Sequence, residues 1–483
     1  MSLRVLNSTL HLRELQTRMP FRFGIANVTR LLHAILRIEF EIDGRRQIGL
    51  AAENLVPKWF TKDPNTTPQQ DQQQMVGVIR TAMQLAGELG PVESVYQLWR
   101  QLQAGMEQPS RAPASPDPPL LLGLGVSLVE RAAIDALCRA RRVAFWQAMR
   151  AGMLGIELGQ IYPQDLIGAR PAELLPPRPL SRVLVRHTVG LSDPLSDSDI
   201  SPADRLDDGL PHSLQSCIDA YGLRSFKIKL WGDVQRDSSR LADIAALLDA
   251  NCPDYAYSLD GNENFHQVEP LIELWRRLSE QPRLKRFLSR LMFLEQPLHR
   301  EIALSEPTRR QLLIWSDRPA MIIDESGAST QDVVDALAGG YVGVSHKNCK
   351  GVIKGIAAAC LIESRRRRGQ ARLILSAEDL SNTGPIALAQ DLAVVAALGV
   401  GHVERNGHHY FRGLHAWPKE LQQAVLAEHA DLFRAVSAQD ASVSFVAPAI
   451  QAGQMWLDSL NSAAFGVGAA SWQRVLAELN GST

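Results

Sequence analysis

Apolar and polar residues alternate over residues 3–43, most regularly in the segment Leu32–Ile42. A period of two is typical of a β-strand that buries one face. Asp43-Gly44 then interrupts the pattern before Arg46–Leu50, as expected of a tight hairpin turn. We therefore expect a small antiparallel sheet in this first part of the chain.

Helical spacing follows, with apolar residues recurring every three or four positions from Gln70 to Trp99. The proline-rich stretch Pro109–Pro119 fits neither a helix nor a central strand, so we expect an exposed loop there. Ser127–Met149 returns to helical spacing. Ser127 is its expected N-cap, and Glu130 three residues later completes the pattern of a capping box.

A second proline-rich stretch, Pro171–Pro179, precedes a regular alternation of short apolar runs and longer helical stretches. The spacing from run to run suits a strand, a loop, a helix and a return, which predicts an α/β fold of the (β/α)8 type. The eight expected strands are Val183–Val189, Ser225–Leu230, Tyr257–Asp260, Phe293–Glu295, Met321–Asp324, Tyr341–Lys347, Ala371–Ser376 and Gly399–Glu404. Helices are expected at Arg236–Ala250, Val268–Ser279, Thr330–Ala338, Val352–Arg365 and Pro385–Leu398.

Charge and hydropathy exclude several classes of protein. Lysine and arginine number 51 against 52 aspartate and glutamate, so no basic excess indicates nucleic-acid binding. The longest apolar runs are too short to span a bilayer, and the first residues lack the apolar core of a signal peptide. We therefore expect a cytoplasmic protein with no membrane partner. Five scattered cysteines without a C-x-x-C pair indicate core thiols in a reduced compartment and argue against zinc.

Two lysines, Lys227 and Lys229, lie one residue apart in the apolar run Ser225–Leu230. A strand directs both side chains to the same face. Two ammonium groups in one small space are unfavourable unless anionic groups or a chemical role balance them. The alternative is an edge strand with two solvated lysines.

An acidic residue ends each of the next three runs, namely Asp260, Glu295 and Asp324, and Lys347 ends the run after them. The carboxyl ends of barrel strands meet at one mouth, where such folds carry out their chemistry. Three carboxylates in a small dry space require a cation, and all-oxygen ligation favours Mg2+, with Mn2+ as a second candidate. The alternative is that each acid only caps the helix that follows.

Lys229 and Lys347 would then face each other across the mouth. A lysine acts as a base only when its pKa is lowered, which a nearby Mg2+ and the ammonium of Lys227 would both do. The metal would bind a substrate carboxylate and stabilise the enediolate that remains when the α-proton leaves. This arrangement predicts an enzyme that acts on a small-molecule carboxylate.

Five motifs together resemble the enolase superfamily, in particular its muconate-lactonizing-enzyme-like, mandelate-racemase-related subgroup. They are Lys227-x-Lys229, Asp260-x-Asn262, Leu294–Pro297, Asp324–Ser326, and Lys347 followed by Lys350-Gly351. The resemblance implies a modified TIM barrel at residues 180–417 and an N-terminal α+β capping domain at residues 1–170. It also implies that residues 418–483 form a C-terminal segment that packs back on the cap.

The resemblance assigns roles to individual residues. Asp260, Glu295 and Asp324 would be the metal ligands, Lys229 and Lys347 the acid/base pair, and Lys227 a positioning residue. Two cap loops, Phe21–Ile25 and Asn54–Phe60, would cover the substrate. The substrate-binding candidates lie in a covering loop or at strand ends, and they are Phe21, Phe23, Asn262, Glu325, Glu378 and Glu404.

Two departures from the family pattern narrow the expected reaction. Ser376–Asp379 lacks the histidine that mandelate-racemase-like members use, and His402–Asn406 lacks the paired aspartates of dipeptide epimerases. Opposed lysines favour a racemase, an epimerase or a cycloisomerase of a small carboxylic acid. An acid-sugar dehydratase is the alternative, and a non-catalytic metal-binding barrel is a more distant one. A symmetric homo-oligomer is the expected assembly.

Four histidines lie close together in sequence, and they are His402, His408, His409 and His415. Since no cysteine or facing partner accompanies them in the sequence, we expect solvated or hydrogen-bonded loop side chains and not a metal site.

Overall fold

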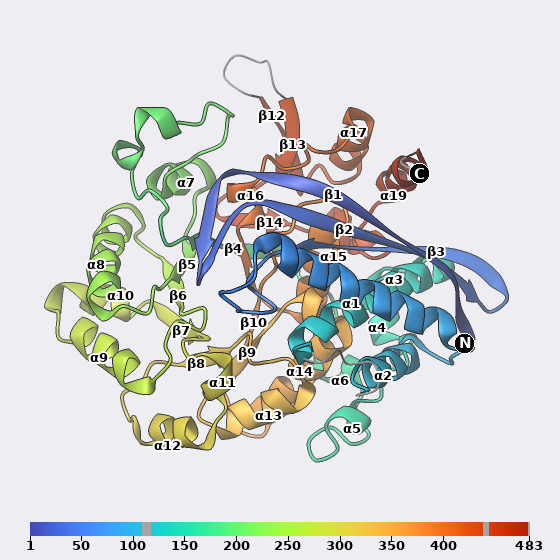
Figure 1. The fold of residues 1–483 in the computed structure, drawn as a ribbon, viewed down its shortest axis with the longest axis horizontal. Helices are drawn as coiled ribbons and strands as arrows, with labels where there is room; N and C mark the ends of the chain where they lie inside the picture. Colours follow the sequence, from blue (N-terminus) through green and yellow to red (C-terminus); the bar gives the residue numbers. More distant parts are fainter. Residues whose placement is uncertain (109–116, 438–443, 482–483) are drawn as a thin grey trace.

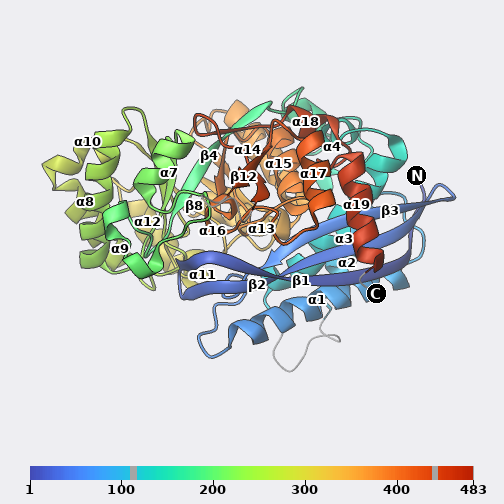
Figure 2. The ribbon, with the colours of Figure 1, turned by 90° about the horizontal axis from the view of Figure 1, so that it is seen from above.

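The computed structural model describes residues 1–108, 117–437 and 444–481. Most of the predicted Pro109–Pro119 loop, residues 109–116, lies outside this described part. A three-stranded sheet with its helices lies along one side of a curled parallel sheet (Figures 1 and 2). No helix in the described residues is long and apolar enough to cross a membrane.

The three-stranded sheet confirms the expected antiparallel start of the chain. Its order is β1-β2-β3, with β1 at Leu3–Phe23, β2 at Ala26–Ile42 and β3 at Arg45–Leu55. Between β2 and β3, Asp43 and Gly44 have φ values of 48° and 76°, the left-handed conformations that a tight hairpin needs. The helices of this region are α1 (Pro68–Glu88), α2 (Val95–Met106), α3 (Pro119–Arg141), α4 (Phe145–Arg150), α5 (Leu158–Ile161) and α6 (Pro171–Leu174).

Eight parallel strands form the predicted barrel-type sheet, in the hydrogen-bonded order β10-β9-β8-β7-β6-β5-β4-β11. The two end strands, β10 and β11, lie against each other, so the sheet curls round on itself. The strands are β4 (Arg182–Val189), β5 (Ser225–Lys229), β6 (Ala256–Asp260), β7 (Leu291–Glu295), β8 (Met321–Ile323), β9 (Gly343–His346), β10 (Ile374–Ala377) and β11 (His402–Arg405).

Helices connect successive strands and cover the outside of this sheet (Figure 1). They are α7 (Leu214–Tyr221), α8 (Val234–Asn251), α9 (Val268–Ser279), α10 (Lys285–Leu288), α11 (Arg300–Ala303), α12 (Glu306–Ile314), α13 (Thr330–Ala338), α14 (Val352–Arg367) and α15 (Ala387–Leu398). Together with the N-terminal sheet, they confirm the expected barrel with an α+β cap.

The C-terminal segment contacts both parts of the fold. Strand β14 (Gln454–Trp456) pairs antiparallel with β4, and α19 (Ala469–Gly481) lies on the cap. Trp472 of α19 donates a hydrogen bond of 3.0 Å to Asp135 of α3. The remaining elements of this segment are α17 (Lys419–Glu428), β12 (Phe433–Ser437), β13 (Ser444–Pro448) and α18 (Asp458–Ser462), and the short helix α16 (Gly407–Tyr410) precedes it, after β11.

The predicted helix start at Ser127 is wrong. Helix α3 begins at Pro119 and is continuous through Ser127, whose hydroxyl donates to the carbonyl of Leu124 at 2.9 Å. Proline is well suited to the first turn of a helix, and the apolar residues after it continue the buried face. Glu130 instead accepts from the backbone N–H groups of Val352 and Ile353, so it caps α14 from another part of the chain.

The burial of the cysteines and of two histidines can be compared with what the sequence led us to expect. All five cysteines are buried, which confirms them as core thiols. His408 and His409 are also buried, at 4% and 2% exposure, and both have polar partners, so of the two expected states they are hydrogen-bonded and not solvated. Both lie in the short helix α16, which packs against β1 of the cap.

Candidate active site

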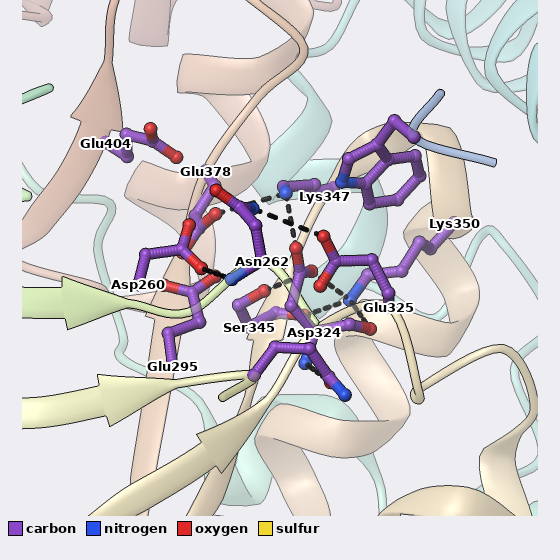
Figure 3. A network of polar contacts seen from close by, with 12 residues as sticks. Asp260, Asn262, Glu295, Asp324, Glu325, Ser345, Lys347, Lys350, Glu378 and Glu404 are labelled. Atoms are coloured by element: carbon purple, nitrogen blue, oxygen red, sulfur yellow. Dashed lines mark hydrogen bonds and ion pairs between the residues drawn. The ribbon is translucent and has the colours of Figure 1, made fainter. Parts of the chain in front are cut away.

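The register of the parallel strands brings the charged residues of the barrel to one level. Lys229 lies opposite Asp260 in the β5–β6 ladder, and Asp260 lies opposite Glu295 in the β6–β7 ladder. Asp324 directly follows β8, and Lys347 directly follows β9. Figure 3 shows Asp260, Glu295, Asp324 and Lys347 in one network of polar contacts, and Lys229 joins it by donating a hydrogen bond to Asp260. The structure thus brings the sequence-predicted lysines and carboxylates together at the strand ends.

Lys227 is the fully buried centre of this network. Its ammonium lies 2.6 Å from Glu378, 2.9 Å from both Asp260 and Glu404, and 3.0 Å from Glu295. Burial alone would lower the pKa of Lys227, but these carboxylates raise it well above its ordinary value. Lys227 is therefore a fixed cation that binds four strand ends to one another.

The other two lysines each hold a carboxylate at the edge of the network. Lys229 donates to Asp260 at 2.6 Å. Lys347 donates to Asp324 at 2.5 Å and lies 3.1 Å from Glu378. Burial opposes the charge of Lys347, but Asp324 and Glu378 raise its pKa well above the ordinary value.

A cluster of three carboxylates that could share a cation contains two of the three ligands that the resemblance implies, Glu295 and Asp324, together with Glu378. Glu295, Asp324 and Glu378 each offer an oxygen within 4.8 Å of the other two. Asp260, expected in place of Glu378, accepts instead from Lys229 and, at 2.8 Å, from the backbone N–H of Asn262. Figure 3 shows Asp260, Glu295 and Glu378 side by side.

Glu295 retains free capacity to bind a cation. Among the described residues, its carboxylate has an ion pair with Lys227 at 3.0 Å, but neither oxygen accepts a hydrogen bond of regular geometry. Burial, followed by the charge of Glu378, raises the pKa of Glu295 well above its ordinary value. Buried carboxylates that repel one another supply the oxygen ligands that Mg2+ or Mn2+ prefers.

Asp324 accepts hydrogen bonds from two further residues whose part in the site was not predicted from the sequence. Lys350 donates to Asp324 at 2.9 Å, and the Ser345 hydroxyl donates to the same oxygen at 2.6 Å. Burial opposes ionisation of Asp324, but Lys347 and Lys350 lower its pKa. Glu325 next to it has its pKa raised to about 8 by burial and by the charge of Asp324, and it accepts a weak 3.4 Å hydrogen bond from Asn262.

Two residues of β4 complete the wall and were missed from the sequence. Arg186 donates to Glu378 at 3.1 Å, and Thr188 donates to Glu404 at 2.6 Å. Their spacing of two in an apolar strand is the same signal that singled out Lys227 and Lys229. This spacing could have identified Arg186 and Thr188 as site residues from the sequence alone.

Aromatic residues of the cap cover both outer lysines. The ammonium of Lys229 lies 5.7 Å from the ring centre of Phe23, and that of Lys347 lies 4.5 Å from the ring centre of Trp59. A small cavity of about 20 Å³ remains between cap and barrel. Both rings and both lysines line it, together with Phe21, Asn262 and Glu404. A cavity of this size holds about one water, so a substrate larger than that would require the cap loops to move.

No protein-family model matches the chain, and no curated protein matches it significantly. Solved structures match over nearly the whole fold. A mandelate racemase/muconate lactonizing protein from Herpetosiphon aurantiacus is 16% identical with a TM-score of 0.57, covering 96% of this chain and 98% of its own. A dipeptide epimerase from Methylococcus capsulatus complexed with Mg and the dipeptide L-Arg-D-Lys is 16% identical with a TM-score of 0.54, covering 85% and 93%. A muconate lactonizing enzyme from Pseudomonas fluorescens complexed with muconolactone is 15% identical with a TM-score of 0.54, covering 83% and 87%.

At these identities the likeness concerns the fold. The chain has the capped-barrel fold of the mandelate racemase/muconate lactonizing structures of the enolase superfamily, as its motifs led us to expect.

Proposed function

We propose that the protein is an enzyme that removes the proton α to the carboxylate of a small carboxylic acid, with Mg2+ as cofactor. One observation supports this most directly: Lys229 and Lys347, from strands on different sides of the barrel, line the same buried cavity beside a carboxylate cluster. A substrate between them would present one face to each ammonium group.

The metal site would use the oxygen-rich cluster. Glu295 and Asp324 would hold the ion together with Glu378, or with Asp260 if Lys229 releases it. When bound, Mg2+ would supply positive charge beside the substrate carboxylate and so make the α-proton more acidic. Lys227 would keep the surrounding carboxylates in place, since it already contacts Asp260 and Glu295.

Each of the two lysines would carry out one step of the proton transfer. The Nζ of one, in its neutral form, would accept the α-proton, and the ammonium of the other would return a proton to the opposite face. Such 1,1-proton transfer gives a racemase or an epimerase, and cycloisomerisation uses the same first step. Phe23 and Trp59 would exclude water from the reacting face while the cap is closed.

A dehydratase of acid sugars is the second candidate. The surroundings of Lys347 support it, because its ammonium lies 2.5 Å from Asp324 and 3.1 Å from Glu378, and these carboxylates raise its pKa. A strongly protonated Lys347 suits a general acid that donates to a departing hydroxyl group, while Lys229 accepts the α-proton.

Proton exchange followed by NMR in D2O tests the proposal. The full-length protein with Mg2+ is incubated with both enantiomers of acid sugars, N-acylated amino acids, dipeptides and lactone precursors. We expect exchange of the α-proton in at least one class. For at least one enantiomer, it should fall about 10²–10⁴-fold in at least one of the variants Lys229→Ala and Lys347→Ala. The exposed Lys285→Ala is the matched control and should retain full exchange.

The pattern across enantiomers separates the two reactions. In a racemase, each lysine variant keeps exchange of one enantiomer, and the two variants keep opposite ones. In a dehydratase, only Lys229→Ala abolishes exchange, and Lys347→Ala abolishes release of water. Full exchange in both variants, or exchange that persists after Mg2+ is removed with a chelator, contradicts the proposal.

A further inference from the structure

A second group of metal-ligating side chains lies behind strand β4, outside the barrel interior. Arg186 and Thr188 of this strand reach Glu378 and Glu404 inside the barrel. Because successive side chains of a strand alternate between its faces, His187 points to the outer face. There it meets the helices that follow β4 and β11, which are α7 and α16.

Three potential ligands converge at this outer face. His187, Cys217 of α7 and His409 of α16 each offer a ligand atom within 4.8 Å of the other two. The thiol sulfur of Cys217 lies 3.6 Å from Nδ1 of His409. All three side chains are at most 2% exposed. A buried set of two imidazoles and one thiol is chemically unlike the carboxylates of the candidate active site, and it suits Zn2+ or another borderline or soft ion.

Neighbouring groups orient both imidazoles. Nδ1 of His187 lies 3.0 Å from Nε2 of His408, which leaves Nε2 as the remaining ring nitrogen of His187. Nε2 of His409 lies 3.7 Å from the carboxylate of Asp193, while its Nδ1 faces the cysteine. Histidines that bind metals are commonly held in this way, with the second ring nitrogen on a polar partner.

The surrounding charges also suit a divalent ion. A neutral imidazole is the form of histidine that binds a metal. Binding would release the thiol proton of Cys217. The thiolate and Asp193 would then balance the two positive charges. Of the cations near these groups, Arg18 is paired with Asp208 at 2.6 Å, and Arg240 donates to the backbone carbonyl of Asp193 at 2.7 Å.

We propose that His187, Cys217 and His409 form a structural site for a transition-metal ion of the Zn2+ class, separate from the oxygen-rich cluster at the barrel mouth. Zinc was not expected because the cysteines form no C-x-x-C pair, and a histidine metal site was not expected because no cysteine or facing partner accompanies His409 in the sequence. The fold brings Cys217 and His187 to His409. By binding one ligand from each element, the ion would hold β4, α7 and α16 together. Tyr410 of α16 stacks on Phe21 of the cap with ring centres 4.1 Å apart, so the site would also support the cap strand.

Cobalt binding tests this site directly. The full-length protein is freed of metals with a chelator and titrated with Co2+ in the presence of excess Mg2+, which competes for the carboxylates. We expect one Co2+ per chain with thiolate-to-cobalt charge-transfer absorption, and we expect Zn2+ to displace it. The absorption should be lost in Cys217→Ser and unchanged in the control Cys252→Ser, whose cysteine is buried elsewhere.

His408→Gln keeps all three ligands and alters only the partner of His187. We expect about 10–100-fold weaker Co2+ binding in this variant, with the charge-transfer band still present at saturation. Circular dichroism shows whether each variant is folded. An absent thiolate band in the folded parent protein, or an intact band in Cys217→Ser, would overturn the proposal.

Discussion

Glu130 allows a quantitative test of how the cap is joined to the barrel. Its carboxyl group accepts hydrogen bonds from the N–H groups of Val352 (3.1 Å) and Ile353 (2.6 Å), in the first turn of α14. A helix N-terminus favours a negative charge. Burial nevertheless has the larger effect and raises the pKa of Glu130 to about 7. Ionised Glu130 therefore destabilises the folded protein relative to its protonated form.

The size of the effect follows from the two pKa values. Since the pKa of Glu130 is higher in the folded protein than its ordinary 4.5, its contribution is complete below about pH 4.5 and is lost as the pH rises through about 7. At about 1.4 kcal/mol per pH unit, this difference corresponds to about 3 kcal/mol. Glu130→Gln keeps an acceptor oxygen but cannot ionise. The free energy of unfolding of this variant, minus that of the parent, should therefore rise by up to this amount between about pH 4.5 and about pH 8.

Urea unfolding of both proteins across this pH range is the measurement, with the difference between the two taken at each pH. Other titrating groups are common to the pair and cancel. Glu41→Gln is the matched control, because Glu41 is an exposed carboxylate of the same cap, on β2, and its replacement removes a carboxyl group that is not buried. A flat difference for Glu130→Gln, or one that falls as the pH rises, would refute the reasoning.

Two further predictions concern stability. Lys227→Met keeps the length of the side chain but leaves the carboxylates of Asp260, Glu295, Glu378 and Glu404 without their common cation, so we expect a loss of about 3–5 kcal/mol in urea unfolding. Unchanged stability would show that this buried charge is not required. Gly343→Ala places a Cβ 1.9 Å from the carbonyl oxygen of Ile374 in the neighbouring strand, and should destabilise by about 1–3 kcal/mol or more. Gly77→Ala in α1, where an added Cβ meets no atom within 4 Å, is its control and should stabilise by about 1 kcal/mol or less.

The fold could be predicted from the sequence where local patterns determine it. Two predicted helices, Val268–Ser279 and Thr330–Ala338, match α9 and α13 at both ends. For α13, the Ser329 side chain accepts from the backbone N–H of Asp332, a signal that depends only on neighbouring residues. Ser127 and Glu130 show the same spacing, but the start of α3 at Pro119 and the approach of α14 override it. Contacts between distant segments leave no such local signature.

The same distinction applies to the sites. Acids and lysines at the carboxyl ends of parallel strands must approach one another, so their meeting was predictable from spacing alone. Which carboxylate pairs with which ammonium depends on side-chain reach, and the proximity of Glu378 to Glu295 and Asp324 did not follow from the sequence. Cys217 and His409 lie 192 residues apart, and no periodicity connects them.

The pairing of β14 with β4 constrains the order in which the chain folds during synthesis. β14 covers the backbone edge of β4 at Arg182–Leu184, just before β4 begins to pair with β5 at Arg186. In the cap, Asp135 likewise accepts a hydrogen bond from Trp472 of α19. During synthesis, the barrel lacks β14 and the cap lacks α19 until these C-terminal elements have left the ribosome. The nascent chain therefore carries an open strand edge that can pair with another chain, and cap and barrel are expected to mature in one late step.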